Sequence, residues 1–298
     1  MSQVAADPTL RVACVQFRPR LGDVAANLEA TCDLLAAARA QGADLVVFPE
    51  LSLTGYFLKD LVPEVAIALD GPEVATLQRA ADGLATLVGA VVETPDHLFH
   101  NTGLLVGDAG VLHLHRKLYL PTYGLFDEQR DLAPGNRIRG MTLRLPGRVP
   151  WRVGVLICED LWHPSAPYAL SRQGLDLLLC PSASPGQGVQ GPDGPVGSAA
   201  SYAAMTRTYA ELFTTFLVYC NRVGYEDGVQ FWGGSRVLGA DGSLLAGPAP
   251  AEPVILMATV DRGALRRARI AYPLLRDERP ALVAAALRET DGELPAGD

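Results

Sequence analysis

A short apolar run that ends in a cysteine and two carboxylates constrains the fold of this chain most. Residues 153–157 (VGVLI) are followed directly by Cys158, Glu159 and Asp160. The run is too short for a helix, is rich in apolar and β-branched side chains and has polar flanks, which indicates a buried strand. In an α/β protein functional groups gather where strands end, so Cys158 stands where a nucleophile would. A free cysteine is also often a small buried hydrophobe, and this stretch alone leaves both interpretations open.

The composition is that of an acidic globular protein with a large core. The 298 residues are 49% apolar and 19% charged, and the net charge is −8. This charge argues against binding to nucleic acid or to an anionic membrane, and no apolar run approaches the roughly 20 residues of a membrane span. Residues 1–7 lack the basic and apolar regions of a secretory signal, and the five cysteines are an odd set without CxxC spacing. We therefore expect a cytoplasmic protein.

Apolar runs and helical periodicities alternate along the chain, which predicts an α/β fold. We expect strands at residues 11–17, 45–48, 85–92, 103–106, 111–115, 153–157, 176–180, 216–221 and 254–260, and helices at 27–41, 71–81, 164–174, 199–213 and 262–270. The three strands between residues 85 and 115 follow one another closely, so we expect antiparallel pairs within a mixed sheet. A turn at Asp241 and Gly242 predicts a hairpin of residues 235–238 and 243–245. We expect one domain over residues 1–298, with a tail from residue 271.

Two polar residues follow predicted strands and are candidates for chemistry. Glu50 lies just beyond the end of the strand 45–48, and Lys117 follows the strand 111–115. Taken singly, the first could be a solvated loop carboxylate and the second a surface lysine. Their position at strand ends is nevertheless the one in which α/β folds place functional groups.

Two loops and two histidines complete the candidate features. The loop 122–136 mixes aromatic and charged residues as a pocket wall does. The Gly-, Pro- and Ser-rich stretch 181–198 indicates a lid or binding loop, or a connection without function. His113 and His115 share one face of a strand, but no third ligand has suitable spacing. We therefore expect no metal and no cofactor.

Three short motifs occur in one order along the chain: FPE at 48–50, HRK at 115–117 and ICE at 157–159. Together with NRVG at 221–224 and FWGGS at 231–235, they resemble the nitrilase (carbon–nitrogen hydrolase) superfamily. The resemblance covers about residues 11–261. It implies a four-layer α-β-β-α sandwich with mixed sheets and a catalytic set of glutamate, lysine and cysteine.

Within the superfamily, the detail is most similar to the glutaminase domain of glutamine-dependent NAD synthetases. The similar stretches are residues 49–56, 120–128, 158–162 and 182–185. On this resemblance we assign the substrate pocket to six residues of those stretches: Tyr56, Tyr123, Phe126, Glu159, Trp162 and Ser184. The basic residue that the family carries after the Ser-Pro step has no counterpart in residues 186–190.

The resemblance also implies a role for each catalytic residue. Cys158 would be the nucleophile that forms a thioester, and Glu50 the general base. Lys117 and the backbone N–H of Glu159 would stabilise the oxyanion of the tetrahedral intermediate. Glu128 matches an additional carboxylate of the superfamily that positions the lysine and the substrate.

The sequence thus predicts an amide hydrolase that acts on a small linear amide, with glutamine as one candidate. Such a protein could be the glutaminase subunit of a separate NAD synthetase. An N-carbamoyl amine amidase or an ω-amidase is the alternative within the enzyme class. A non-catalytic binding protein that keeps the fold is the alternative of another class. We expect a homodimer or a larger homo-oligomer, with residues 271–298 in the contacts between subunits.

Overall fold

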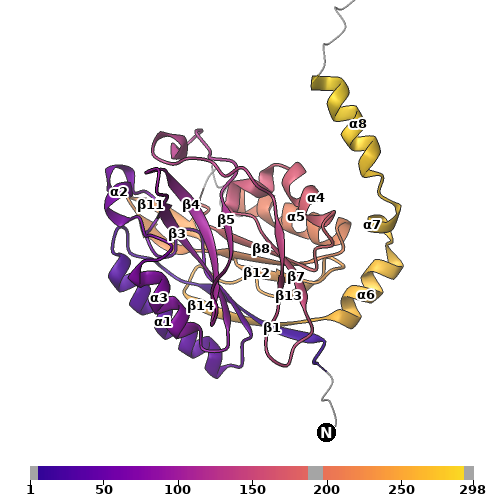
Figure 1. Ribbon diagram of the computed structural model, residues 1–298, viewed down its shortest axis with the longest axis horizontal. Helices are drawn as coiled ribbons and strands as arrows, with labels where there is room; N and C mark the ends of the chain where they lie inside the picture. The colour runs from indigo at the N-terminus through magenta and orange to yellow at the C-terminus, as the bar shows by residue number, and fades with distance from the viewer. Residues whose placement is uncertain (1–5, 187–196, 292–298) are drawn as a thin grey trace, which may run out of the picture.

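Two six-stranded sheets pack face to face in the computed structural model, which describes residues 6–186 and 197–291 (Figure 1). The first sheet has the strand order β14-β1-β2-β3-β4-β5 and the second the order β13-β12-β9-β8-β7-β6. Helices α1 (Val24–Ala40) and α3 (Pro72–Ala81) cover the outer face of the first sheet. Helices α4 (Ser165–Ser171) and α5 (Gly197–Leu212) cover that of the second. The predicted four-layer α-β-β-α sandwich with mixed sheets is confirmed.

The other elements are as follows. The strands of the first sheet are β1 (Thr9–Gln16), β2 (Leu45–Val47), β3 (Ala85–Glu93), β4 (Phe99–Gly107), β5 (Gly110–Arg116) and β14 (Val254–Asp261). Those of the second sheet are β6 (Gly140–Leu143), β7 (Trp151–Val155), β8 (Leu177–Ser182), β9 (Phe216–Asn221), β12 (Arg236–Leu238) and β13 (Leu244–Ala246). A separate hairpin consists of β10 (Val223–Glu226) and β11 (Val229–Trp232), and the remaining helices are α2 (Val62–Val65), α6 (Arg262–Ala271), α7 (Leu274–Asp277) and α8 (Pro280–Asp291).

The central strands are apolar on both faces because both faces are buried. In β1, Val12 and Cys14 belong to the core between the two sheets. Their neighbours Ala13 and Val15 belong to the core between the first sheet and its helices. Successive side chains of a strand point to opposite faces, so a strand buried on both sides reads as a continuous apolar run.

Strand direction brings the ends of central strands to one place. Strands β1, β2 and β3 run parallel, as do β7, β8 and β9. The expected antiparallel pairs β3–β4 and β4–β5 are confirmed. Residues that follow β2, β5 and β7 therefore meet at one edge of the sandwich, where α/β folds place their chemistry.

The structure corrects several predicted boundaries. The strand predicted at 103–106 begins at Phe99. Its first half carries polar side chains and therefore lacks the apolar run by which the second half was recognised. The run 153–157 is a strand only as far as Val155, and Cys158 opens a short 3-10 helix. The sequence interpretation missed β6 and the hairpin β10–β11. The predicted hairpin around Asp241 is confirmed as β12 and β13.

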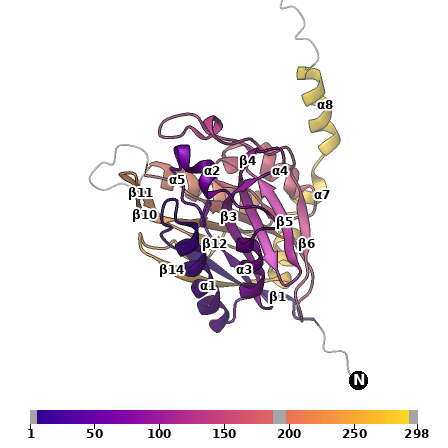
Figure 2. The same ribbon diagram turned by 60° about the vertical axis from the view of Figure 1, so that its left-hand side comes forward.

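The C-terminal helices leave the body of the sandwich. Helices α6, α7 and α8 run along one side, and α8 projects away from both sheets (Figures 1 and 2). Most of the stretch predicted as a lid, 181–198, lies outside the described residues, so its role stays a prediction. Over residues 6–186 and 197–291, no helix is both long and apolar enough to cross a membrane.

Candidate active site

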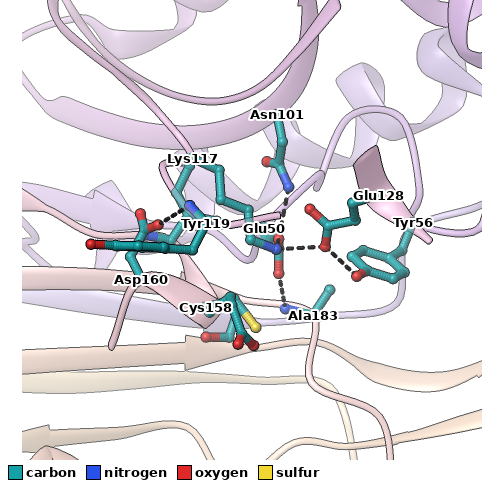
Figure 3. Close-up of polar contacts among 12 residues, drawn as sticks. Glu50, Tyr56, Asn101, Lys117, Tyr119, Glu128, Cys158, Asp160 and Ala183 are labelled. Atoms are coloured by element: carbon teal, nitrogen blue, oxygen red, sulfur yellow. Dashed lines mark hydrogen bonds and ion pairs between the residues drawn. The ribbon is translucent and has the colours of Figure 1, made fainter. Parts of the chain in front are cut away.

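Glu50 lies just beyond β2 and is held from three directions (Figure 3). Its Oε1 accepts hydrogen bonds from Asn101 Nδ2 and from Lys117 Nζ, both at 2.7 Å. Its Oε2 accepts from the backbone N–H of Ala183, also at 2.7 Å. The residue is only 1% exposed. A buried carboxylate needs such partners, and these three fix both its position and its orientation.

Lys117 follows β5 and joins Glu50 to a second carboxylate. Its Nζ lies 2.6 Å from Glu128 Oε1, and the lysine is 1% exposed. Burial alone would lower the pKa of Lys117, but the charges of Glu128 and Glu50 outweigh it and raise this pKa well above its usual value. The ammonium group therefore stays charged in a site that excludes water.

Glu128 begins the short 3-10 helix Glu128–Arg130 inside the loop that was predicted to form a pocket wall. Its Oε1 also accepts a hydrogen bond from the Tyr56 hydroxyl, whereas its buried Oε2 has no partner among the described residues. Burial raises the pKa of Glu128 to about 7; Lys117 lowers it and Glu50 raises it. Glu128 can thus change its protonation state near neutral pH.

Cys158 occupies a strained turn directly after β7. Its φ angle is +44°, in the left-handed region that non-glycine residues rarely adopt. The Sγ lies 3.1 Å from the hydroxyl of Tyr202 on α5. Burial and the charge of Glu50 raise the pKa of Cys158 well above its usual value, against the lowering effects of Lys117 and Tyr202. The resting thiol is therefore neutral, and a base must remove its proton before it can act as a nucleophile.

Asp160 links the cysteine turn to the end of β5 and to the backbone just after Lys117. Its Oδ2 accepts from the backbone N–H of Ile157 at 2.9 Å and from His115 Nε2 at 2.8 Å. Its Oδ1 accepts from the backbone N–H groups of Leu118 and Tyr119 at 2.9 and 3.1 Å. His115 is thus engaged by a carboxylate. No group of three or more potential metal ligands exists in the part of the chain that the structure describes.

Three of the six predicted pocket residues form one aromatic group beside Glu128. Phe126 packs edge-to-face against both Tyr56 and Tyr123. The Tyr123 hydroxyl donates to both carboxylate oxygens of Glu159, a fourth predicted pocket residue, at 3.0 and 2.9 Å. Burial raises the pKa of Glu159, and the bond from Tyr123 opposes that change. A cavity of about 190 Å³ borders Tyr56, Phe126 and Glu128.

The other two predicted residues form hydrogen bonds with side chains outside the predicted set. Trp162 is 39% exposed, and its indole N–H donates to the Tyr202 hydroxyl at 3.1 Å. Ser184 is buried, and its hydroxyl accepts from Trp232 Nε1 at 3.3 Å.

Sequence reasoning missed two side chains that contact the central residues. Asn101 comes from the polar half of β4 that was not recognised as a strand, and a buried amide there could have drawn attention to it. Tyr202 lies on α5, in no recognised motif, so nothing in the sequence pointed to its contact with Cys158.

Fold and site together define a class of protein: an α-β-β-α sandwich in which a glutamate, a lysine and a cysteine lie buried at adjoining strand ends. The sequence matches the carbon–nitrogen hydrolase family over residues 11–270. The chain therefore belongs to that family and is an amidase-type hydrolase of carbon–nitrogen bonds.

The similar proteins fall into two groups. The glutamine-dependent NAD(+) synthetase of Thermotoga maritima is 35% identical over 243 residues, which are 79% of this chain but 39% of the synthetase. An (R)-stereoselective amidase of a Pseudomonas species is 31% identical over 287 residues, 95% of this chain and 96% of the amidase. A carbon-nitrogen hydrolase of Helicobacter pylori has the same fold, with a TM-score of 0.81 at 23% identity over 94% of this chain and 98% of its own. The chain thus spans less than half of its synthetase relative and nearly all of the amidase.

Proposed function

We propose that the chain cleaves a small linear amide through a thioester on Cys158, with Glu50 as general base and Lys117 as electrostatic stabiliser. The observation that carries this proposal is the buried chain of contacts from Glu50 through Lys117 to Glu128, next to a thiol that is neutral at rest. A solvated carboxylate or a surface lysine would need no such partners. Three ionisable groups buried together around a cysteine are typical of an active site.

The reaction would proceed in two halves. Glu50 takes the thiol proton while Sγ attacks the amide carbon, and Lys117 with the backbone N–H of Glu159 stabilises the oxyanion. The carbon–nitrogen bond then breaks, and Glu50 returns the proton to the departing amine. Water adds to the thioester while Glu50 takes one of its protons, and the intermediate collapses to a carboxylic acid as Glu50 returns that proton to the departing sulfur, which restores the free thiol and the carboxylate.

Glu128 would hold Lys117 in place rather than react. It shares the lysine with Glu50, and the Tyr56 hydroxyl fixes it from the other side. An ionised Glu128 keeps the ammonium directed at the site, whereas a protonated one weakens that attraction. Activity would therefore depend on the state of Glu128 near neutral pH.

Glutamine is the first candidate substrate. The support is the similarity to glutamine-dependent NAD synthetases, together with Glu159 and Tyr123, which could bind the amino group of an amino-acid amide. In this case the chain would supply ammonia to a separate NAD synthetase subunit. The second candidate is an ω-amidase or N-carbamoyl amine amidase, which the nearly full-length match to an amidase favours.

The same proposal extends to the organisation of the protein. Residues 1–298 would form one hydrolase domain in the cytoplasm, with no cofactor and no nucleic acid or membrane partner. The tail from residue 271 would join copies of the chain into a homodimer or a larger assembly. This assembly is supported by the projecting helix α8, on which Leu282 is 58% exposed, and by Tyr272 at the end of α6, which is 53% exposed.

An ammonia-release screen over glutamine, ω-amides, N-carbamoyl amines and nitriles, with and without an NAD synthetase subunit, tests the function. We expect release from at least one class, an acyl adduct on Cys158 by mass spectrometry, and no turnover by C158A. Failure of every class to release ammonia or to leave an adduct would favour a non-catalytic binding protein instead.

A further inference from the structure

A second pocket lies beside β5, the strand that leads to Lys117. It has a volume of about 450 Å³ and is lined by residues of β5 and of the segment that leads into β6. These two strands are the edge strands of the two sheets, and Figure 2 shows them on the same side of the molecule. Its walls are His113, Leu114, His115, Arg116, Gly135, Asn136, Arg137 and Arg139. None of these residues was assigned to the amide site.

The charge of this pocket is opposite to that of the protein. The chain has 33 acidic and 25 basic residues, yet three arginines and two histidines line the pocket and no carboxylate does. Four further pockets among the described residues are each bordered by at least one aspartate or glutamate. A local excess of positive charge in an acidic protein attracts anions to this one place.

Among the basic side chains of the pocket, only His115 has a carboxylate partner within the described residues, namely Asp160. Within the described residues, none of Arg116, Arg137 and Arg139 forms an ion pair. Arg116 Nε and His113 Nε2 are buried and have no hydrogen-bond partner there. Buried polar atoms are normally satisfied, so these two unsatisfied atoms beside the pocket favour a ligand there.

The pocket wall is held in place by the backbone. The N–H of Gly135 donates to the carbonyl of Lys117 at 2.7 Å. A Cβ at position 135 would lie 2.3 Å from the carbonyl oxygen of Arg116, so only glycine allows this approach. The segment that carries Arg137 and Arg139 is therefore fixed against β5.

We propose that this pocket binds the phosphoryl group of a small molecule that is distinct from the amide substrate. A guanidinium group matches two oxygens of a phosphate or a carboxylate. A carboxylate can occupy only one such fork, whereas a phosphoryl dianion has three oxygens to share among three arginines. The volume leaves room for more than the phosphate alone.

Binding of the ligand would also change the protonation of the His113 imidazole, which lines the pocket. Burial and the neighbouring His115 lower the pKa of His113 to about 4, so this ring is neutral when the pocket is empty. A bound dianion favours the protonated ring, in which both nitrogens donate. Because Arg116 precedes Lys117 and His115 holds Asp160, the ligand would contact the strand that positions the amide site.

Calorimetric titration of the full-length protein with inorganic phosphate and with adenosine monophosphate tests the proposal, at an ionic strength held constant with NaCl. We expect saturable binding, and a loss of roughly tenfold or more in affinity in R137S/R139S. The matched control is R144S/R266S, which removes two exposed arginines outside the pocket and should bind within about twofold of the wild type. Tighter binding of the nucleotide than of phosphate would identify a nucleotide as the source of the group.

A second readout follows the His113 resonance by NMR. Its pKa should rise on addition of phosphate in the wild type and in the control variant, but not in R137S/R139S. Absence of saturable binding of either probe, or an equal loss of affinity in both double variants, would overturn the proposal. Neither result bears on amide hydrolysis, because no substitution touches the residues around Cys158.

Discussion

Replacement of Tyr202 by phenylalanine should weaken the nucleophile without disturbing the fold. The Tyr202 hydroxyl lies 3.1 Å from both Cys158 Sγ and Trp162 Nε1. The indole N–H can only donate, so the hydroxyl accepts from Trp162 and its own proton is available to the sulfur. That hydrogen bond gains strength when the thiol becomes a thiolate, because the acceptor is then charged. Y202F should therefore raise the pKa of Cys158.

The expected size of the effect follows from the type of bond. A hydrogen bond to a charged group contributes about 1.5–3 kcal/mol. Sulfur is a weak acceptor, so we take the lower end, which corresponds to about a tenfold smaller thiolate population. The rate of alkylation of Cys158 by iodoacetamide and kcat/KM should both fall by roughly this factor. Peptide mapping by mass spectrometry separates Cys158 from the other four cysteines.

Tyr209 supplies the control on the same helix. Its hydroxyl donates to the carbonyl of Leu161 at 2.9 Å rather than to the sulfur. Y209F thus removes one buried hydrogen bond from α5 but should leave the alkylation rate within about twofold of the wild type. Equal rates for Y202F and the wild type, or equal losses in both variants, would refute a direct effect of Tyr202 on the sulfur.

Three further predictions concern the residues around the site. E128Q should keep residual activity and lose the rise in kcat/KM near pH 7, measured as a pH profile, because Glu128 ionises there. In the folded protein Glu128 keeps its proton up to about pH 7, whereas in the unfolded chain it would release it near pH 4.5. The contribution of Glu128 to the free energy of unfolding therefore falls as the pH rises from about 4.5 to about 7. The stability of E128Q, measured by urea unfolding, should lack that fall. D160N should destabilise the fold by about 2 kcal/mol or more in the same assay, because four hydrogen bonds end on this carboxylate. N101A should lower kcat by about tenfold with a smaller change in KM, because Glu50 loses one of its three donors; an unchanged kcat would show that the other two suffice.

The placement of Glu50, Lys117 and Cys158 could be predicted because each follows a strand that the sequence indicates, and the strands before Glu50 and Cys158 are apolar. Strands that are buried on both faces are visible in the sequence as short apolar runs, and their ends mark where side chains leave the core. Glu128 could be found only through its motif, because its loop has no periodicity. The pairing of Glu128 with Lys117 depends on how that loop folds back, which no local pattern encodes.

The features that the sequence did not predict depend on contacts over long distances. Tyr202 is 44 residues from Cys158, and its apolar ring is equally compatible with an ordinary core position. The first half of β4 was missed because His100 and Asn101 interrupt its apolar pattern. Both are buried polar residues whose positions are decided by their partners, Ala133 and Glu50. Tertiary hydrogen bonds here outweigh the local preference for apolar residues in a strand.

The hydrogen bonds of Asp160 explain why the motifs around Cys158 and Lys117 contain further polar residues: Asp160 in the first and His115 in the second. The backbone of Cys158 is strained, and such a conformation persists only where surrounding contacts hold it in place. Asp160 supplies this constraint by accepting from the N–H of Ile157 on one side of the cysteine. The same carboxylate binds His115 and the backbone just after Lys117. One buried carboxylate, two residues after the nucleophile, therefore links the cysteine turn to the backbone just after Lys117, so the two loops are not positioned independently.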